Sequence, residues 1–478
     1  MATTPESIVD AFRGALRPFG TVLEFGLESL DRTGLPVSNA SLLVDGRLTH
    51  HGNGYGTTSA TALVGGLGEL VERVVGADGV RRLRASAEHG SRRELVARHG
   101  SSAVVDPRLL ALPAGADWSE DRPGEWLPLA DVRTDERVWV PVELVASDAT
   151  EAAGVADPLL PSVTNGLGAG LDRERALAHG LGEVLQRHTN GLRFRSLDRL
   201  SPAIEDDGLP PSVAALVAQL RAVGIDPVLK VASTGLGVCS TYVMGRDDAP
   251  PAPIALSGCG EGAHADPAAS LTKALLEFAH SRARKVFCFG EPSAVLGVAP
   301  AAYRDAIDPR VGDERSASEL RRWSGLGAAE LGALVLPEVS RSVPFASLAP
   351  SGAAPTSDAP SDVLAHHLHH LADHRVLAAT YERDGVVATK VLVTGLDVET
   401  LAMGRLGEHG VRESLHHDLD LVRIAPEPVG EHRSRVHLTP DAEDRLGGAA
   451  WFSYAAAERI VGRQYPQYRE PGRHSVVV

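Results

Sequence analysis

A glycine pattern that occurs three times constrains the fold of this chain more than any other feature. Gly-x-Gly-x-Gly is found at residues 52–56, 166–170 and 258–262, and each pattern leads directly into a segment with helical periodicity. With 49 glycines among 478 residues, chance would give about 0.5 such patterns. The sequence therefore predicts an internal repeat, in which a glycine-rich loop is followed by a helix.

The predicted helices carry similar charged groups at similar spacing. A glutamate follows the last glycine of the pattern by 13 residues in the first two units and by 15 residues in the third. The first helix continues Glu69-Leu70-Val71-Glu72-Arg73, and the second continues Glu183-Val184-Leu185-Gln186-Arg187. Because positions i, i+3 and i+4 share one helix face, each helix presents oxygen ligands beside an arginine. The third helix offers Glu277 and Arg282.

These groups predict a site for a divalent cation and a phosphate. Carboxylate and phosphate oxygens are the ligands that Mg²⁺ prefers, and arginine binds phosphate oxygens through a planar set of donors. Salt bridges on the surface of ordinary helices are the alternative interpretation. The threefold repetition favours the binding site.

Helical and strand-like patterns alternate without the regular order of a doubly wound parallel sheet, so we predict an α+β fold with mixed sheets. Helices are expected at residues 6–17, 57–75, 172–189, 213–223, 267–285 and 361–374. Strands are expected at residues 22–27, 35–45, 138–145, 227–231, 238–244, 375–381 and 386–393.

Composition and charge argue against several classes of protein. The net charge is −15 and the chain has four lysines, so a duplex nucleic-acid binder is not expected. Cys239, Cys259 and Cys288 form no Cys-x-x-Cys pair, which predicts buried thiols in a reducing compartment. No apolar run approaches the length of a membrane span. We therefore expect a cytoplasmic protein that does not enter the membrane.

The residues around the three glycine patterns resemble the YcaO-domain family. The matching stretches are LDRTGLPVSNA, HGNGYGTTSATALVGGLGELVER, VTNGLGAGLDRERALAHGLGEVLQRH, GCGEGAHADPAASLTKALLEFAHSR and TKVLVTGLD. They occur in the order found in the family and extend from about Asp31 to Asp397. The second glycine pattern and its helix form the most specific of these stretches.

The resemblance implies a fold that binds ATP and Mg²⁺ without a P-loop, and the chain indeed has no such motif. It also implies that the enzyme phosphorylates a backbone amide of a ribosomally made precursor peptide. A Cys, Ser or Thr side chain, a sulfide or an amine then attacks, which yields an azoline, a thioamide or an amidine. By the same resemblance, the expected metal ligands are Glu69, Glu72, Glu183, Gln186 and Glu277, and the expected nucleotide contacts are Arg73, Arg187, Arg282, Gly168 and His264.

Several residues depart from the family pattern. Gly65 replaces a serine, Gln186 a glutamate, His188 an aspartate and His280 a glutamine. Gln186 keeps an oxygen ligand but removes one negative charge. The chain also lacks the Pro-x-Pro-x-Pro ending of many azoline-forming members. A second hypothesis is therefore a non-catalytic scaffold, or a peptide-binding partner of another modifying enzyme.

The expected organisation is a catalytic domain over residues 1–410 and a C-terminal extension over residues 411–478 that packs on or near the active site. The first contains an N-terminal segment, 1–50, and a flexible loop, 340–362, that is rich in Ala, Pro and Ser. Partners implied by the resemblance are the precursor peptide, a separate leader-binding or sulfur-transfer protein, and a second copy in a homodimer. Neither nucleic acid nor a membrane is an expected partner.

A histidine cluster offers a competing metal site. His366, His370 and His374 are spaced at i, i+4 and i+8, so that one face of a helix could bind Zn²⁺ or Ni²⁺. An exposed, partly charged helix face is the simpler interpretation.

Overall fold

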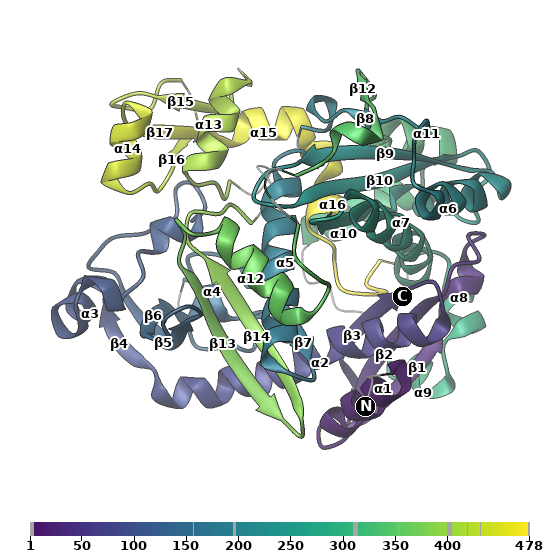
Figure 1. Ribbon diagram of the computed structural model, residues 1–478, viewed down its shortest axis with the longest axis horizontal. Coiled ribbons are helices and arrows are strands. Elements are labelled where there is room, and N and C mark those ends of the chain that lie inside the picture. Colours follow the sequence, from purple (N-terminus) through teal and green to yellow (C-terminus); the bar gives the residue numbers. More distant parts are fainter. Residues whose placement is uncertain are drawn as a thin grey trace.

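The computed structural model describes residues 4–155, 157–194, 197–308, 314–350, 352, 354–398, 404–417, 419–430 and 432–476 (Figure 1). Helices and sheets are mixed in this part of the chain, and the α+β prediction is confirmed. None of the described helices combines the length and the apolar composition that a membrane crossing requires.

The described residues form four sheets, and the helix α5 (Arg173–Gly191), which packs against the second and the third of them, lies near the middle of the view (Figure 1). The first has the order β1-β2-β3, with β1 (Thr21–Gly26), β2 (Val37–Val44) and β3 (Arg47–Tyr55). The second has the order β11-β10-β9-β8-β12, with β8 (Ala203–Ile204), β9 (Ile225–Ser233), β10 (Cys239–Asp247), β11 (Gly260–His264) and β12 (Ser342–Val343).

The third sheet has the order β4-β5-β13-β14-β7, and β6 pairs with β5. Its strands are β4 (Glu88–Ser91), β5 (Pro123–Asp131), β6 (Arg137–Pro141), β7 (Leu167–Gly170), β13 (Val376–Arg383) and β14 (Val386–Val393). The fourth sheet is small, has the order β15-β17-β16, and consists of β15 (Val422–Ile424), β16 (Arg433–Arg435) and β17 (Ala450–Ser453).

The helices cover these sheets and connect them. Those of the central sheets are α1 (Pro5–Leu16), α2 (Ser59–Leu83), α3 (Arg92–His99), α4 (Val142–Val145), α5 (Arg173–Gly191), α6 (Pro211–Ala222), α7 (Pro267–Phe289) and α12 (Pro360–His370). The others are α8 (Pro292–Val298), α9 (Ala301–Asp305), α10 (Glu314–Ser324), α11 (Ala328–Val335), α13 (Glu408–His416), α14 (Pro440–Leu446), α15 (Tyr454–Val461) and α16 (Tyr465–Tyr468).

The three glycine patterns are strands, and the prediction that they are loops is wrong. Residues 52–55 lie in β3, residues 167–170 in β7 and residues 260–262 in β11, and each of these strands forms one edge of its sheet. A Cβ atom on Gly54 would lie 2.0 Å from the carbonyl oxygen of Ala62, and one on Gly168 would lie 2.2 Å from that of Ala176. The glycines are therefore required because strand and helix backbones touch, as glycine inside a strand often indicates.

Each of these strands leads to its helix through the same kind of N-cap. The side chains of Thr58, Asp172 and Asp266 accept hydrogen bonds from backbone amides in the first turns of α2, α5 and α7, respectively. Such caps satisfy amide groups that the helix leaves without partners. In each unit, the middle strand of three antiparallel strands pairs with the glycine strand. The repeat thus consists of three strands and one helix.

Most predicted elements are present, with differences at their ends. The helix predicted to end near Val75 continues to Leu83, and Gly79 within it leaves room for the ring of Tyr381. The strand predicted over 138–145 ends at Pro141 and is followed by α4. The helix predicted over 361–374 ends at His370.

The segment 340–362 is more ordered in its first part than the sequence predicts. Residues Ser342 and Val343 form β12, which pairs in parallel with β8, and Leu348 is buried in the core beneath α6 and α7. Residues 351 and 353 lie outside the described part. The segment is therefore fixed to the second sheet over residues 342–348.

The fourth sheet forms a small module with α13 and α14, at the upper left of Figure 1. Helix α13 spans residue 410, so the predicted boundary between residues 410 and 411 would divide a helix. After α15 and α16 the chain returns to the central sheets, where the backbone amide of His474 donates a hydrogen bond to the carbonyl oxygen of Cys288 (3.1 Å). The C-terminal tail thus lies against α7.

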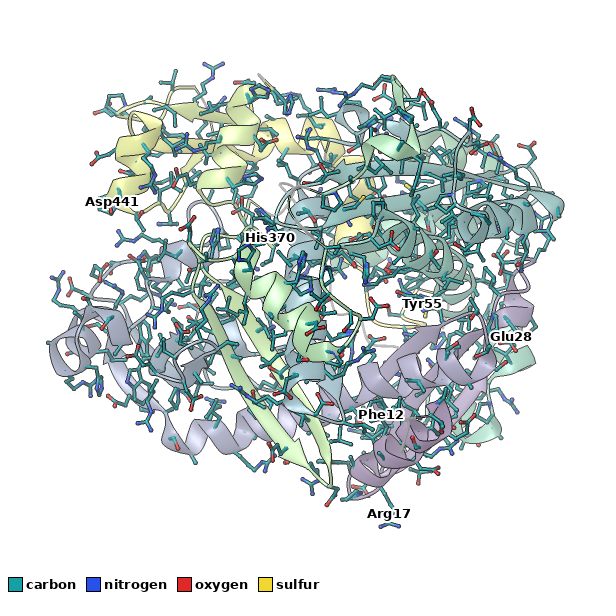
Figure 2. All side chains as sticks on the ribbon, viewed as in Figure 1. Phe12, Arg17, Glu28, Tyr55, His370 and Asp441 are labelled. Atoms are coloured by element: carbon teal, nitrogen blue, oxygen red, sulfur yellow. The ribbon has the colours of Figure 1, made fainter. Side chains whose placement is uncertain are left out.

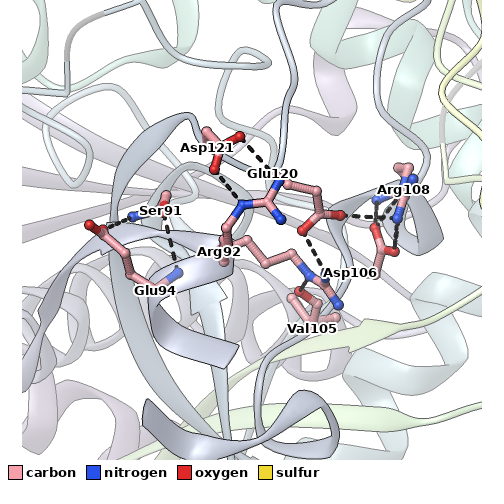
Figure 3. A network of polar contacts seen from close by, with 9 residues as sticks. Ser91, Arg92, Glu94, Val105, Asp106, Arg108, Glu120 and Asp121 are labelled. Atoms are coloured by element: carbon pink, nitrogen blue, oxygen red, sulfur yellow. Dashed lines mark hydrogen bonds and ion pairs between the residues drawn. The ribbon is translucent and has the colours of Figure 1, made fainter. Parts of the chain in front are cut away.

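A network of ion pairs fixes the region around α3 (Figure 3). Arg92 and Arg108 both bind Glu120, at 2.8 and 3.1 Å, and Arg108 also binds Asp106 at 2.6 Å. Ser91 caps α3, and its amide in turn donates to Glu94. These charged side chains therefore have a structural role.

The strand–helix contact is tested by Gly168→Ala. We expect a loss of about 2 kcal/mol or more in the free energy of unfolding, because the added Cβ would lie 2.2 Å from one backbone atom of α5 and 2.7 Å from another. Gly76→Ala is the matched control. Gly76 is a helical glycine with no neighbour within 4 Å of a Cβ, so its replacement should gain up to about 1 kcal/mol. Equal urea midpoints for the two variants would contradict the close contact.

Candidate functional site

The three repeat units form a ring. Helix α2 contacts β7 of the second unit, α5 contacts β11 of the third, and α7 contacts β3 of the first. Each helix is therefore packed on its own glycine strand and also against the glycine strand of the next unit. The same helix positions in the three units face a common centre as a result.

When the three units are aligned by the contacts between strand and helix, the glutamate of the third unit has the same spacing as the glutamates of the other two. Gly54, Gly168 and Gly262 each contact helix residues that lie eight and twelve positions further along the chain. His264 therefore occupies the position of Gly56 and Gly170, and Glu277 follows it by 13 residues, as in the other units. The extra glycine, Gly258, belongs to a different contact, because its Cβ would collide with Arg282.

This register also explains the place of Arg282. Arg73 and Arg187 lie four residues after the glutamate of their helix, whereas Arg282 lies five residues after Glu277. One extra residue rotates a side chain by about 100° around a helix. Arg282 is fully buried in the core and binds Asp31 at 2.6 and 2.9 Å and Asp247 at 2.7 Å. The structure does not bring it together with the other predicted nucleotide contacts.

Three carboxylates come together where α2 meets the second unit. Glu69 accepts hydrogen bonds from the amide of Asn53 and from Arg73, both at 2.7 Å. Burial would raise the pKa of Glu69, but Arg73 and the Asn53 amide offset this effect and hold that pKa below its usual value. Burial raises the pKa of Glu72 well above its usual value, and the charges of Glu183 and Glu69 raise it further. This part of the site therefore favours an added cation.

The arginines and a histidine border these carboxylates. The side chain of Arg187 is 38% exposed and lies 3.7 Å from Glu183 and 3.6 Å from Glu261. His179 is 54% exposed, and its Nε2 lies 3.6 Å from Oε1 of Glu72. The centre of the ring is thus accessible from solvent, although it lies among three helices.

A second group of polar side chains surrounds Glu277. The hydroxyl of Tyr55, which is labelled in Figure 2, donates a hydrogen bond to Glu277 at 3.0 Å. Nζ of Lys273 donates to Oε1 of Gln186 at 2.8 Å, so this predicted metal ligand already accepts a hydrogen bond. Burial raises the pKa of Glu277, an effect that Lys273 partly offsets.

The sequence interpretation did not assign Tyr55, Glu261 or Lys273 to the site. A signal was present for Lys273, which stands on the same helix face as Glu277 and one turn before it. Tyr55 and Glu261 lie in glycine strands that were expected to be loops, and strand alternation is what turns them toward the neighbouring helix. Their positions could be assigned only with the strands in register.

His280 occupies the helix position that holds Glu72 in the first unit and Gln186 in the second. Its ring is 9% exposed and lies 5.4 Å from that of Tyr55. Burial and the charge of Arg284 lower the pKa of His280 to about 3, and Arg473 from the C-terminal tail acts in the same direction. His280 is thus a neutral side chain beside the tail.

The two remaining predicted contacts have local structural roles. Gly168 lies in β7 and allows the close approach to α5 described above. Nδ1 of His264 accepts a hydrogen bond from the amide of Asp266 (2.9 Å), the residue that caps α7. Their contact with a nucleotide stays a prediction.

The carboxylates of the site suit a Mg²⁺ ion that also binds phosphate oxygens. Among the residues that the structure describes, no three His, Cys, Asp or Glu side chains converge as a closed metal site. Mg²⁺ is usually held by one or two carboxylates together with substrate phosphates and water, so a closed site of protein ligands is not needed. Glu69, Glu72 and Glu183 supply oxygens of the required kind at a place where their charges repel one another.

For the described residues, the alternative prediction that His366, His370 and His374 bind one metal ion is wrong. Helix α12 ends at His370, so His374 is not on the same helix. Nε2 of His366 forms a hydrogen bond with the carbonyl oxygen of Gly237 (2.9 Å), and Nδ1 of His374 forms one with the carbonyl oxygen of Thr394 (2.6 Å). The histidines therefore serve separate contacts between α12, α5 and the adjoining strands.

The repulsion at Glu72 is tested by Glu72→Gln in the ligand-free protein. A carboxyl with a raised pKa costs stability when it is ionised, so the variant should be more stable than the wild type at pH 8. The gain should shrink as the pH falls toward the ordinary glutamate pKa, about 4.3. Urea unfolding across this pH range measures the difference, with Glu174→Gln at the exposed start of α5 as the control. A less stable Glu72→Gln at pH 8 would refute the repulsion.

A family model described as YcaO cyclodehydratase, ATP- and Mg²⁺-binding, matches residues 53–397. An uncharacterised protein of Methanothermobacter thermautotrophicus is 29% identical over 328 residues, which cover 67% of this chain and 78% of that protein.

Two solved structures share the fold. The YcaO protein of Methanopyrus kandleri, bound with AMPPCP and Mg²⁺, gives a TM-score of 0.59 at 22% identity and covers 85% of this chain and 94% of that one. A heterocyclase in complex with substrate and cofactor gives 0.62 at 15% identity and covers 90% of this chain and 56% of that one. The family match spans most of the sequence, including every helix of the ring. This chain belongs to the YcaO family, for which the cofactors are ATP and Mg²⁺.

Proposed function

We propose that this protein uses ATP and Mg²⁺ to modify the backbone of a ribosomally made precursor peptide in natural-product biosynthesis. The observation that carries the proposal is the ring of three helices. It gathers Glu69, Glu72 and Glu183 beside Arg73 and Arg187, and the electrostatic repulsion among the carboxylates favours a cation. Family membership supports the same cofactors.

The proposed reaction begins with transfer of the terminal phosphoryl group of ATP to the carbonyl oxygen of a peptide amide. A nucleophile then adds to the amide carbon, and the oxygen leaves with the phosphate. A Cys, Ser or Thr side chain yields an azoline, a sulfide yields a thioamide, and an amine yields an amidine. An amide oxygen leaves poorly until it is phosphorylated, which is why the reaction consumes ATP.

The residues of the ring have separate tasks in this reaction. Glu69, Glu72 and Glu183 would hold Mg²⁺, which neutralises charge on the phosphoryl oxygens when it is bound. Arg73 and Arg187 are positioned by Glu69 and Glu183 and can donate hydrogen bonds to phosphate oxygens. Electrostatic stabilisation of this kind requires donors that are already oriented in the free protein.

The second candidate is a non-catalytic scaffold or peptide-binding partner of another modifying enzyme. It is favoured by one observation, the hydrogen bond from Lys273 that occupies the oxygen of Gln186. A scaffold would bind peptide without consuming ATP. For either candidate we propose a cytoplasmic location, a separate leader-binding or sulfur-transfer protein, and a homodimer.

Nucleotide binding is tested by the thermal stability of the ligand-free chain and of the chain with Mg·ATP. Ligand at about 100 times its dissociation constant adds about 2.7 kcal/mol to the stability of a protein. We expect this gain in the wild type and its loss in Glu183→Gln, which keeps the size of the side chain and removes a metal-binding charge. Glu174→Gln lies on the same helix and should behave as the wild type. A full gain in Glu183→Gln would exclude Glu183 as a ligand.

The fate of the amide oxygen tests the chemistry itself. A peptide labelled with ¹⁸O at its backbone carbonyls should transfer the label to inorganic phosphate during turnover, because the oxygen leaves bonded to phosphorus. Mass spectrometry of the released phosphate measures the transfer. Modified peptide with unlabelled phosphate would contradict amide phosphorylation, and peptide binding without ATP consumption would support the scaffold.

A further inference from the structure

The glutamates of the first two units are each held by two contacts. Glu69 accepts a hydrogen bond from the backbone amide of Asn53 at 2.7 Å and pairs with the arginine four residues later in its helix. Glu183 accepts a hydrogen bond from the backbone amide of Gly166 at 2.9 Å and likewise lies beside the arginine four residues later. A strand amide and an arginine thus fix the direction of each carboxylate.

In the described part of the chain, the equivalent Glu277 of the third unit has neither contact. The residue four positions later is Ser281, and its hydroxyl accepts a hydrogen bond from the amide of Cys259 at 3.2 Å. Among the described residues, Glu277 has one hydrogen-bond donor, the hydroxyl of Tyr55 at 3.0 Å. The third glutamate is therefore held by a side chain from the first unit, in β3.

Tyr55 is suited to donate to this carboxylate. Its side chain is partly buried where β3 meets α7, and its ring lies 5.4 Å from that of His280 at an interplanar angle of 32°. Burial raises the pKa of Tyr55 well above its usual value, and the charge of Glu277 raises it further. The phenol therefore keeps its proton at neutral pH, and its position is fixed by packing.

The carboxylate of Glu277 stays accessible in spite of this contact. Its residue is partly exposed, whereas the neighbouring Phe278 and Leu276 are buried. An ionised carboxylate has about four acceptor positions on its two oxygens, and the bond from Tyr55 occupies one of them. The remaining positions can bind a ligand at the ring centre while Tyr55 holds the group in place.

We propose that Tyr55 is a positioning residue, which holds the carboxylate of Glu277 toward the ring centre as an additional oxygen ligand for a divalent cation that arrives with ATP. This inference rests on the proposed function, because it requires a metal–nucleotide ligand at the ring. A hydrogen bond from a neighbouring residue orients a metal-bound carboxylate, and its removal weakens metal binding by about 10- to 100-fold. The three units then hold their glutamates by different means for the same task.

The experiment measures binding of Mn²⁺, added together with the non-hydrolysable analogue AMPPCP, by electron paramagnetic resonance. We expect Tyr55→Phe, which removes only the hydroxyl, to raise the dissociation constant of Mn²⁺ by about 10- to 100-fold. Tyr381→Phe is the matched control, because the hydroxyl of Tyr381 is buried and has no hydrogen-bond partner among the residues that the structure describes. It should bind Mn²⁺ as the wild type does. Thermal unfolding without ligands shows whether each variant is folded.

A double-mutant cycle separates positioning from a general structural role. If Tyr55 acts through Glu277, Tyr55→Phe should cause no further loss of Mn²⁺ binding in a Glu277→Gln background. Losses that add in full would show that Tyr55 acts independently of Glu277 and would overturn the proposal. Wild-type affinity in Glu277→Gln alone would exclude Glu277 as a ligand and overturn it as well.

The wild-type protein distinguishes this inference from the proposed function. If the wild type binds Mn²⁺ and AMPPCP, and Tyr55→Phe binds them equally well, the inference is wrong and the proposed function stands. If the wild type binds neither Mn²⁺ nor AMPPCP, both are wrong.

Discussion

Contact between a strand and a helix without an intervening side chain is the constraint on which the rest of the structure depends. In all three units, a glycine strand at the edge of a sheet lies so close to its helix that a Cβ would fall about 2 Å from a helix carbonyl oxygen. Such an approach sets the position of each helix relative to its own sheet. Each helix also contacts the glycine strand of the next unit, and three such contacts close a ring.

The charged side chains are distributed unevenly around the ring. Its first two helices carry the carboxylates that raise the pKa of Glu72, and each of these helices has an arginine paired with its own glutamate. The third helix carries Lys273, Glu277 and His280, and its neighbours Tyr55 and Gln186 are neutral partners. One side of the centre therefore favours a cation, and the other side carries a lysine that donates a hydrogen bond to a neutral amide.

The sequence was sufficient to predict the helices and most of the candidate site, because both depend on periodicity. Glu69, Glu72, Glu183 and Gln186 follow from spacing along two helices, and their faces are set by the 3.6-residue turn. The glycine strands were mistaken for loops since glycine is common in loops, and close backbone approach is not visible in one sequence. The resemblance assigned Arg282 to the nucleotide, whereas its ion pairs with Asp31 and Asp247 in the core are visible only in the fold. The partner of Lys273 lies 87 residues away on another helix and could be found only from the fold.

A crystal structure with a non-hydrolysable ATP analogue and Mn²⁺ in place of Mg²⁺ would test the central claim most directly, since Mn²⁺ can be located by its anomalous signal. The account predicts a manganese peak bonded to oxygens among Glu69, Glu72 and Glu183, with the phosphate chain extending between Arg73 and Arg187. A peak elsewhere would contradict it, for example at the acidic hollow lined by Glu205, Asp206 and Asp207 beside β8 and β9.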